Sequence, residues 1–265
     1  MPAAPSGRVL VTGANGYIAV WIVKKLLDAG FAVRGTVRSA SKAMHLRNLF
    51  KAAGEKFELV IVDDIVEVRV PFTFVHHSES ERPCSQPGAF DEYVQDVTAI
   101  IHNATPVHLN AAEPDEMIIP ALQGTLGILE SARAHGTALQ RVVVLSSTAT
   151  VWRSNTDPSK TLDLDETCWN DEEVAQCREK GRAATPLAMY RASKTLAERA
   201  AWEFIGKYSG EGGVGWDLVT LSPSFVVGPC LHEVDKPEGL GWTAKEWYET
   251  VIKGVVDENA LANTG

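Results

Sequence analysis

Apolar and polar residues follow one another along the chain with two different periods. Short apolar runs such as "RVLVTG" and "RVVVLSS" are typical of buried strands, whereas the segment from Tyr17 to Ala29 places apolar residues at helical spacing. The two kinds of segment alternate in the order strand, helix, strand, helix. This order predicts a doubly wound α/β fold, in which a parallel sheet is covered by helices on both faces.

The predicted elements cover most of the first 230 residues. Strands are expected in "RVLVTG", "FAVRGTV", "FELVIVDDI", "VTAIIHNA", "RVVVLSS" and "WDLVTLSPSFVVGP", and helices over Tyr17–Ala29, over Ser41–Ala53, in "EMIIPALQGTLGILESARAHG" and around Tyr190. Ligands of such sheets bind at the carboxyl ends of the strands, near the switch in strand order. We therefore look for a site where "TGANGYIA", "TVRS", "DDI", "HNATP", "LSSTA" and "LSPSF" follow the apolar runs.

Composition narrows the class of protein. The 265 residues are 45% hydrophobic and carry a net charge of -9, which suits a globular core and disfavours binding to nucleic acid. No apolar run is long enough to span a membrane, and "MPAAPSGRVL" has no signal core, so we expect a cytoplasmic protein with no membrane partner. The four cysteines show no metal-ligand spacing, so neither a metal site nor a disulfide framework is expected.

One segment, residues 66–86, has no periodic pattern. It contains the adjacent histidines His76 and His77, but two neighbouring side chains on an irregular segment do not make a metal site. Long loops inside compact domains are uncommon. We interpret the segment as a disordered surface insertion.

A glycine-rich turn, "VTGANGYIA", joins the first strand to the first helix. Gly13 and Gly16 allow a tight turn in which a pyrophosphate approaches the backbone amides, and the amino end of the helix favours its negative charge. The third small position is Ala19, which permits close helix packing. At the start of an alternating series, this turn predicts a dinucleotide site.

The second strand distinguishes NADP from NAD. An acidic residue at its end would bind the ribose 2'-hydroxyl of NAD, but no Asp or Glu stands between Asp28 and Glu55. Arg38 follows the strand, where a guanidinium can bind a 2'-phosphate, and Lys42 lies one turn further on. Arg47 and Lys51 fit a solvated helix face better. We predict NADP(H) as the cofactor.

Tyr190 and Lys194 are four positions apart in a helical segment and therefore share one face. An ammonium next to a phenol is expected to lower the phenol's pKa by stabilising the phenolate. The strand "RVVVLSS" ends in the hydroxyls of Ser146, Ser147 and Thr148, and a serine hydroxyl there could bind a carbonyl oxygen while Tyr190 delivers the proton. This combination predicts hydride transfer to a carbonyl group.

Seven motifs together resemble the extended short-chain dehydrogenases, in particular the dihydroflavonol-reductase-like branch with its fungal carbonyl and aldehyde reductases. They are "VTGANGYIA", "VRGTVRS", "HNATPV", "VVVLSSTATV", "DETCW", "YRASKTLAERAAW" and "LSPSFVVGP", and the likeness runs from Arg8 to about Pro229. The resemblance implies a Rossmann fold and NADPH-dependent reduction of an aldehyde or ketone. An NAD-dependent epimerase or hydroxysteroid-type dehydrogenase on the same fold is the alternative, as is an NADP-binding protein with impaired catalysis.

The resemblance also assigns roles to individual positions. Ser147, Tyr190 and Lys194 would be catalytic, with Thr148 as a rival for the hydroxyl role. Residues expected to bind the cofactor are Gly13, Asn15, Gly16, Tyr17 and Ile18 at the turn, Arg38 and Lys42 at the 2'-phosphate, Asp64 and Ile65 near adenine, Ala104, Thr105, Tyr190 and Lys194 near the nicotinamide ribose, and Pro223, Ser224 and Val226 by the carboxamide.

The sequence departs from the family pattern in ways that affect the expected domains. Many relatives carry asparagine in a GTxN motif, where this chain has Gly127, and they lack the segment 66–86. We expect an NADP-binding domain over residues 1–222 and a small, truncated substrate lobe over 223–265 that also receives 152–185. The expected partner is a small-molecule carbonyl substrate, and the expected state a monomer or homodimer.

Overall fold

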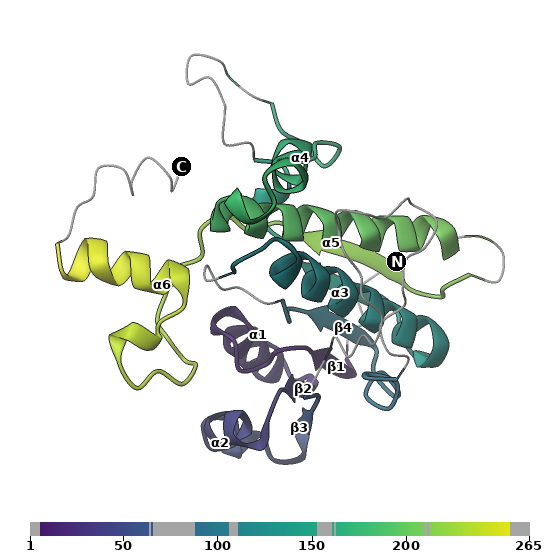
Figure 1. Cartoon of the computed structure of the whole chain (residues 1–265). Helices are drawn as coiled ribbons and strands as arrows, with labels where there is room; N and C mark the ends of the chain where they lie inside the picture. Colours follow the sequence, from purple (N-terminus) through teal and green to yellow (C-terminus); the bar gives the residue numbers. More distant parts are fainter. Residues whose placement is uncertain are drawn as a thin grey trace.

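The computed structural model describes residues 6–63, 65, 88–105, 111–152, 161, 163–208, 210 and 213–254. Its centre is one sheet of six parallel strands (Figure 1). The strands are β1 (Arg8–Val11), β2 (Ala32–Val37), β3 (Phe57–Ile61), β4 (Ala99–His102), β5 (Arg141–Leu145) and β6 (Asp217–Leu221). Their order across the sheet is β3-β2-β1-β4-β5-β6, which is the order of a doubly wound Rossmann fold. The predicted fold class is confirmed.

Helices cover both faces of this sheet. Their bounds are α1 (Tyr17–Asp28), α2 (Ala40–Leu49), α3 (Asp115–His135), α4 (Asp171–Lys180), α5 (Pro186–Tyr208) and α6 (Trp242–Trp247). Short 3-10 turns span Lys51–Lys56, Thr148–Thr150, Gly181–Ala183 and Pro237–Gly239, and a π-helical turn spans Tyr248–Ile252. The long helices α3 and α5 lie side by side (Figure 1).

Alternating strand residues build two separate cores. Leu10, Ile100 and Val142 face α3 and α5 and pack there with Leu129 and Phe204. Their neighbours point to the opposite face, where Val9, Val11 and Val33 pack under α1 and α2. Because successive side chains of a strand point to opposite faces of the sheet, each face has its own apolar core, and one layer of helices packs on each.

A third cluster attaches α4 to the outside of α5. Val174 and Cys177 of α4 pack against Ala188 and Met189 of α5. Asn170 caps α4 by accepting a hydrogen bond from the Glu173 amide, and three acidic residues in the first turn suit the positive end of the helix. This cluster supports the amino-terminal part of α5, which carries Tyr190.

Beyond β6 the chain returns across α1 and α2. The Tyr17 hydroxyl donates to the Gly228 carbonyl, the Trp21 indole donates to the Pro229 carbonyl, and His45 bonds the Leu231 carbonyl, each at 2.8 Å. The expected division into domains 1–222 and 223–265 stays a prediction. The expected insertion at 66–86 and its histidines lie outside the described residues.

Several expected elements differ in extent from the observed ones. The strand expected over "WDLVTLSPSFVVGP" ends at Leu221, and the helix expected over Ser41–Ala53 ends at Leu49, where a 3-10 turn with Gly54 at φ 55° takes over. The helix expected around Tyr190 runs from Pro186 to Tyr208. Of the helices that can be described, none is long and apolar enough to cross a membrane.

Candidate active site

The strand order reverses between β1 and β4, and the ends of these two strands are tied together. The Thr12 hydroxyl oxygen accepts hydrogen bonds from the amides of Asn103 and Ala104, both at 3.0 Å. Gly13 follows at φ 62°, and a Cβ atom there would approach Ala104 Cα to 3.2 Å. The glycine is therefore needed both for its backbone conformation and for the close approach of β4. This is the switch point at which such sheets bind ligands.

The amino end of α1 opens onto this switch point. Gly16 is the residue before the helix, with no side-chain cap, and the first turn contains no acidic residue. Such a helix end leaves backbone amides and a positive dipole for an anion. The turn that holds Asn15, Tyr17 and Ile18 thus fits a pyrophosphate, and the residues present agree with a dinucleotide site.

Arg38 and Lys42 lie beside the end of β2, and both are exposed. Among the residues that the structure describes, neither forms an ion pair. Lys42 and Asn15 line one cavity of about 180 Å³, together with His45, Leu46, His232, Glu233 and Gly239. Arg38 and Lys42 are thus two positive charges next to the glycine turn with no described ion-pair partner. Such a pair can bind a phosphate monoester.

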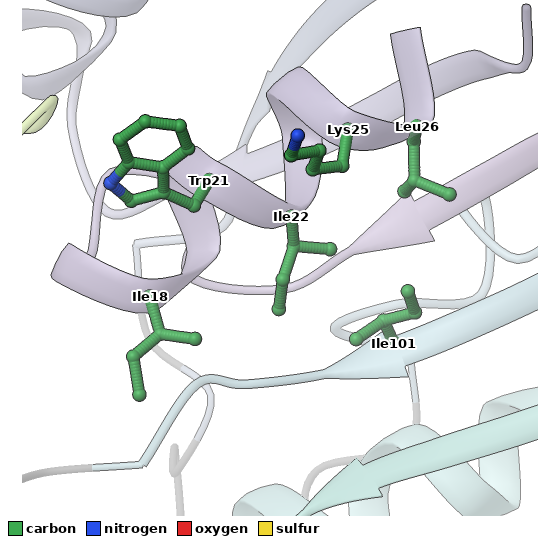
Figure 2. Close-up of a pocket in the computed structure, with 6 residues that line it drawn as sticks. All are labelled: Ile18, Trp21, Ile22, Lys25, Leu26 and Ile101. Carbon is green, nitrogen blue, oxygen red and sulfur yellow. The ribbon is translucent and has the colours of Figure 1, made fainter. Parts of the chain in front are cut away.

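A larger cavity of about 370 Å³ lies elsewhere, between α1 and β4. Figure 2 shows its lining, which is Ile18, Trp21, Ile22, Lys25 and Leu26 from α1 and Ile101 from β4. The lining is almost entirely apolar and holds none of the predicted catalytic side chains. The side chain of Ile18 points into this groove, so a cofactor role for Ile18 would fall to its backbone.

The structure brings Tyr190, Ser147 and Lys194 together at the carboxyl end of β5. Tyr190 and Lys194 come from one face of α5, and Ser147 directly precedes the 3-10 turn Thr148–Thr150. The Ser147 side chain lies within hydrogen-bonding reach of the Tyr190 hydroxyl and lowers the pKa of that phenol. The Lys194 ammonium donates to the Leu145 carbonyl at 3.2 Å and to the Thr105 hydroxyl at 3.3 Å, which joins α5 to the ends of β5 and β4.

The pKa of Tyr190 corrects one expectation. A lowered pKa was predicted from the neighbouring ammonium, but burial of the phenol raises the pKa above 10.0, and the hydrogen bond with Ser147 lowers it by less. Removing a phenolate from water is the larger effect because the ring is mostly enclosed by protein. In the chain alone, Tyr190 is a neutral phenol at pH 7.

Burial shifts the pKa of Lys194 in the opposite direction. Lys194 is 7% exposed, and burial lowers its pKa from 10.5 to about 8, while the negative charge of Glu198 raises it. An ammonium is expected below pH 8 and a neutral amine above. Lys194 is therefore a buried cation at neutral pH, next to the hydroxyls of the site.

The other predicted positions surround this centre to different degrees. The Thr148 amide donates to the Pro223 carbonyl at 3.0 Å, which places the segment with Ser224 and Val226 beside the strand end. Thr148 has no described side-chain bond to Tyr190, unlike Ser147. Ile65 packs against the core over α3, and Asp64 lies outside the described residues.

Two buried residues of the site were not predicted. His102 ends β4, is 1% exposed and bonds the Thr12 hydroxyl. Glu198 lies one helical turn after Lys194, is 8% exposed and accepts a hydrogen bond from the Ser146 hydroxyl. The available signals were the polar end of an apolar strand for His102 and the i, i+4 spacing from Lys194 for Glu198. No cluster of three or more metal-ligand side chains occurs in the described part of the chain.

Comparison with known proteins identifies the family to which the chain belongs. A sequence profile described as the NAD dependent epimerase/dehydratase family matches residues 9–240. A tetraketide alpha-pyrone reductase from Arabidopsis thaliana is 38% identical over 228 residues, covering 85% of this chain and 59% of the relative. A putative NADPH-dependent methylglyoxal reductase from Candida albicans is 33% identical over 259 residues, covering 95% of this chain and 66% of the relative.

A solved structure has a similar fold. The yeast methylglyoxal/isovaleraldehyde reductase Gre2, solved in complex with NADPH, superposes with a TM-score of 0.69 at 31% identity and covers 84% of this chain and 59% of its own. The chain thus spans about three fifths to two thirds of the length of the relatives it matches. These findings confirm the resemblance read from the seven motifs.

Proposed function

The chain belongs to the NAD dependent epimerase/dehydratase family, and on this premise we propose that it reduces an aldehyde or ketone to the alcohol with NADPH. Ser147, Tyr190 and Lys194 would carry the chemistry. Within this proposal the protein acts in the cytoplasm, as a monomer or homodimer, on a small-molecule carbonyl compound.

The observation that carries the proposal is the meeting of three side chains beside the switch point. A phenol, a serine hydroxyl and a buried ammonium share the end of β5, and Thr105 joins the ammonium to the end of β4. Carbonyl reduction needs a proton donor, a donor that orients the carbonyl oxygen, and a positive charge that stabilises the anion left behind. These three groups supply one each.

The chain's own residues would act in the following way. Tyr190 is a neutral phenol at pH 7, which is the form able to give its proton to the carbonyl oxygen. Ser147 would hold that oxygen through a hydrogen bond, and the Lys194 ammonium would stabilise the phenolate until solvent returns a proton. The bound cofactor supplies the hydride that becomes bonded to the carbonyl carbon.

The preference for NADPH rests on the surroundings of β2. Arg38 and Lys42 would bind the 2'-phosphate, and the glycine turn with Gly13 and Gly16 would bind the pyrophosphate. Gre2 was solved with NADPH, and the Candida albicans relative is described as NADPH-dependent. The NADPH named for these two proteins agrees with the positive charges of Arg38 and Lys42 beside β2.

A spectroscopic assay tests this function. NADPH absorbance would be followed with a panel of aldehydes, ketones and dihydroflavonols, with NADH as the control cofactor. We expect turnover of at least one carbonyl class and a clear preference for NADPH. Cofactor binding without turnover of any carbonyl would contradict a reductase, and a preference for NADH would contradict the role of Arg38 and Lys42.

A further inference from the structure

Glu198 is a buried carboxylate with one direct hydrogen-bond partner among the described residues. It lies on α5, is 8% exposed, and accepts a hydrogen bond from the hydroxyl of Ser146, which is itself 6% exposed. Among the described residues no lysine, arginine or histidine lies within ion-pair distance of it. A buried carboxylate held by one neutral hydroxyl is unfavourable unless a positive charge nearby compensates it.

That positive charge is Lys194. The two residues stand at i and i+4 on the same buried face of α5, and the charge of Glu198 favours the charged form of Lys194. The ammonium itself contacts only neutral acceptors, the Thr105 hydroxyl and the Leu145 carbonyl. Glu198 and Lys194 therefore balance each other's charge without direct contact.

Among the described residues, the elements around this pair supply no competing charge. His102, at the end of β4, is a neutral imidazole at pH 7, because burial and the positive charge of Lys194 both lower its pKa. The buried residues of α3 are all uncharged, and the α4 carboxylates Glu173 and Asp171 pair with Arg191 and Arg199. On β6, Asp217 pairs with Arg141.

Ser146 connects this pair to the strand that carries Ser147. Its amide donates to the Leu221 carbonyl at 2.7 Å, so Ser146 is still anchored to β6, and the next residue is Ser147. The hydrogen bond from its hydroxyl to Glu198 joins the end of β5 to α5 at this point. The same helix presents Lys194 one turn and Tyr190 two turns before Glu198.

We propose that Glu198 is a positioning residue with two separable effects: it holds the end of β5 against α5 through Ser146, and it supplies the negative charge that keeps Lys194 an ammonium. The inference rests on the proposed reductase function but concerns a residue outside the serine, tyrosine and lysine set. Its carboxylate touches neither Tyr190 nor Ser147 in any described contact.

Two substitutions separate the effects. Glu198→Gln keeps an oxygen that can accept from Ser146 but removes the carboxyl group, whereas Ser146→Ala removes the hydrogen bond and keeps the carboxyl group. Glu203→Gln makes the same chemical change at an exposed position of the same helix and is the control. Melting curves would verify that each variant folds.

The direct readout is the titration of Lys194 itself. Protein labelled with 13C at lysine Cε would be titrated by NMR, with the Lys194 signal assigned from its loss in Lys194→Arg. We expect Glu198→Gln to move the Lys194 midpoint to lower pH, and Ser146→Ala and Glu203→Gln to leave it in place. An unmoved midpoint in Glu198→Gln would overturn the proposal, as would an equal shift in Ser146→Ala.

Kinetics give a second readout. The fall of kcat on the alkaline side should move to lower pH in Glu198→Gln, whereas Ser146→Ala should lower kcat about tenfold with no change in the profile. An unchanged kcat in Ser146→Ala would overturn the positioning role. If the parent chain reduced no carbonyl at all, the proposed function would fail, but the NMR titration would still decide the coupling of Glu198 to Lys194.

Discussion

Thr12 and His102 are joined by a hydrogen bond of 3.0 Å between Oγ1 and Nδ1, where β1 and β4 end side by side. The Thr12 oxygen already accepts two backbone amides, so its own proton is the one shared with Nδ1. The neutral imidazole then carries its proton on Nε2. His102 is therefore part of the switch point.

This relationship predicts an acid-sensitive fold. Burial, and next the positive charge of Lys194, lower the pKa of His102 from 6.5 to about 3. Between these values the unfolded chain binds more protons than the folded one, so stability is lost as pH falls from 6.5 toward 3. The loss is about 2 kcal/mol by pH 5.

Urea unfolding at pH 7.5 and pH 5.0 measures this loss. His102→Asn is expected to lose less stability between the two pH values than the parent chain, because asparagine does not titrate. The control is His135→Asn, because 42% of the His135 side chain is exposed. This variant should lose nearly as much stability between pH 7.5 and pH 5.0 as the parent chain. An equal pH response of His102→Asn and the parent chain would contradict the burial of a neutral imidazole.

Cofactor preference should depend on Arg38. Arg38→Gln removes one charge-assisted contact to a 2'-phosphate and should weaken NADPH binding about tenfold, with little effect on NADH. Arg47→Gln makes the same change at an exposed position of α2 and serves as the control. Quenching of tryptophan fluorescence by each cofactor gives both dissociation constants. If Arg38→Gln and Arg47→Gln weakened NADPH binding equally, the effect would come from the overall positive charge of this region and not from a contact of Arg38.

Reduction should slow on the alkaline side as Lys194 loses its proton. Because its pKa is about 8, the ammonium is present below pH 8 and disappears above it. The rate at saturating NADPH should therefore be highest below pH 8 and fall at higher pH. Stopped-flow measurements from pH 6 to pH 10 would follow this fall, and a rate that rises through pH 8 to 10 would exclude an essential ammonium.

Asn170 should couple the α4 helix to the site. Its side-chain amide donates to the Ala149 and Trp152 carbonyls, while its oxygen caps α4. Asn170→Ala removes all three bonds and should cost about 2 to 3 kcal/mol of stability. Asn170→Ser keeps a hydroxyl oxygen that can cap α4 but loses the donated bonds, so we expect a smaller stability loss than in Asn170→Ala, while kcat should fall in both variants. Identical stability losses would show that the cap contributes nothing.

The sequence predicted the sheet well because each strand lies in a short segment rich in apolar residues, bounded by polar residues or glycine. It predicted α1 to within one residue, since Gly16 and Tyr17 mark a turn followed by helical spacing. The end of β6 was missed because Pro223 and its neighbours pair with the end of β5 through a loop hydrogen bond, which no local pattern records.

The helix α4 was missed for a different reason. Its sequence "DEEVAQCREK" buries only Glu173, Val174 and Cys177, so it has no apolar stripe to detect. The cap at Asn170 with acidic residues after it was the available signal. Periodicity finds helices that bury a wide face, and α4 packs only along a narrow one.

The sequence singled out candidate site residues where they follow motifs and missed buried residues that depend on tertiary packing. Tyr190 and Lys194 were proposed from their i, i+4 spacing on one helix, and Ser147 from its place at the end of an apolar strand. His102 and Glu198 gain their importance only because α3, α5 and the sheet enclose them, and burial of a polar side chain cannot be read from its neighbours in sequence. The raised pKa of Tyr190 has the same origin.

The most direct test of the account is the Tyr190→Phe variant, measured in single turnovers with NADPH bound and the best carbonyl of the panel. Phenylalanine keeps the ring and removes only the hydroxyl, so at saturating NADPH we expect hydride transfer to slow at least about a hundredfold. Tyr208→Phe, at the end of the same helix, should behave like the parent chain. A Tyr190→Phe variant that reduces the carbonyl at the parent rate would contradict the assignment of Tyr190 as the proton donor.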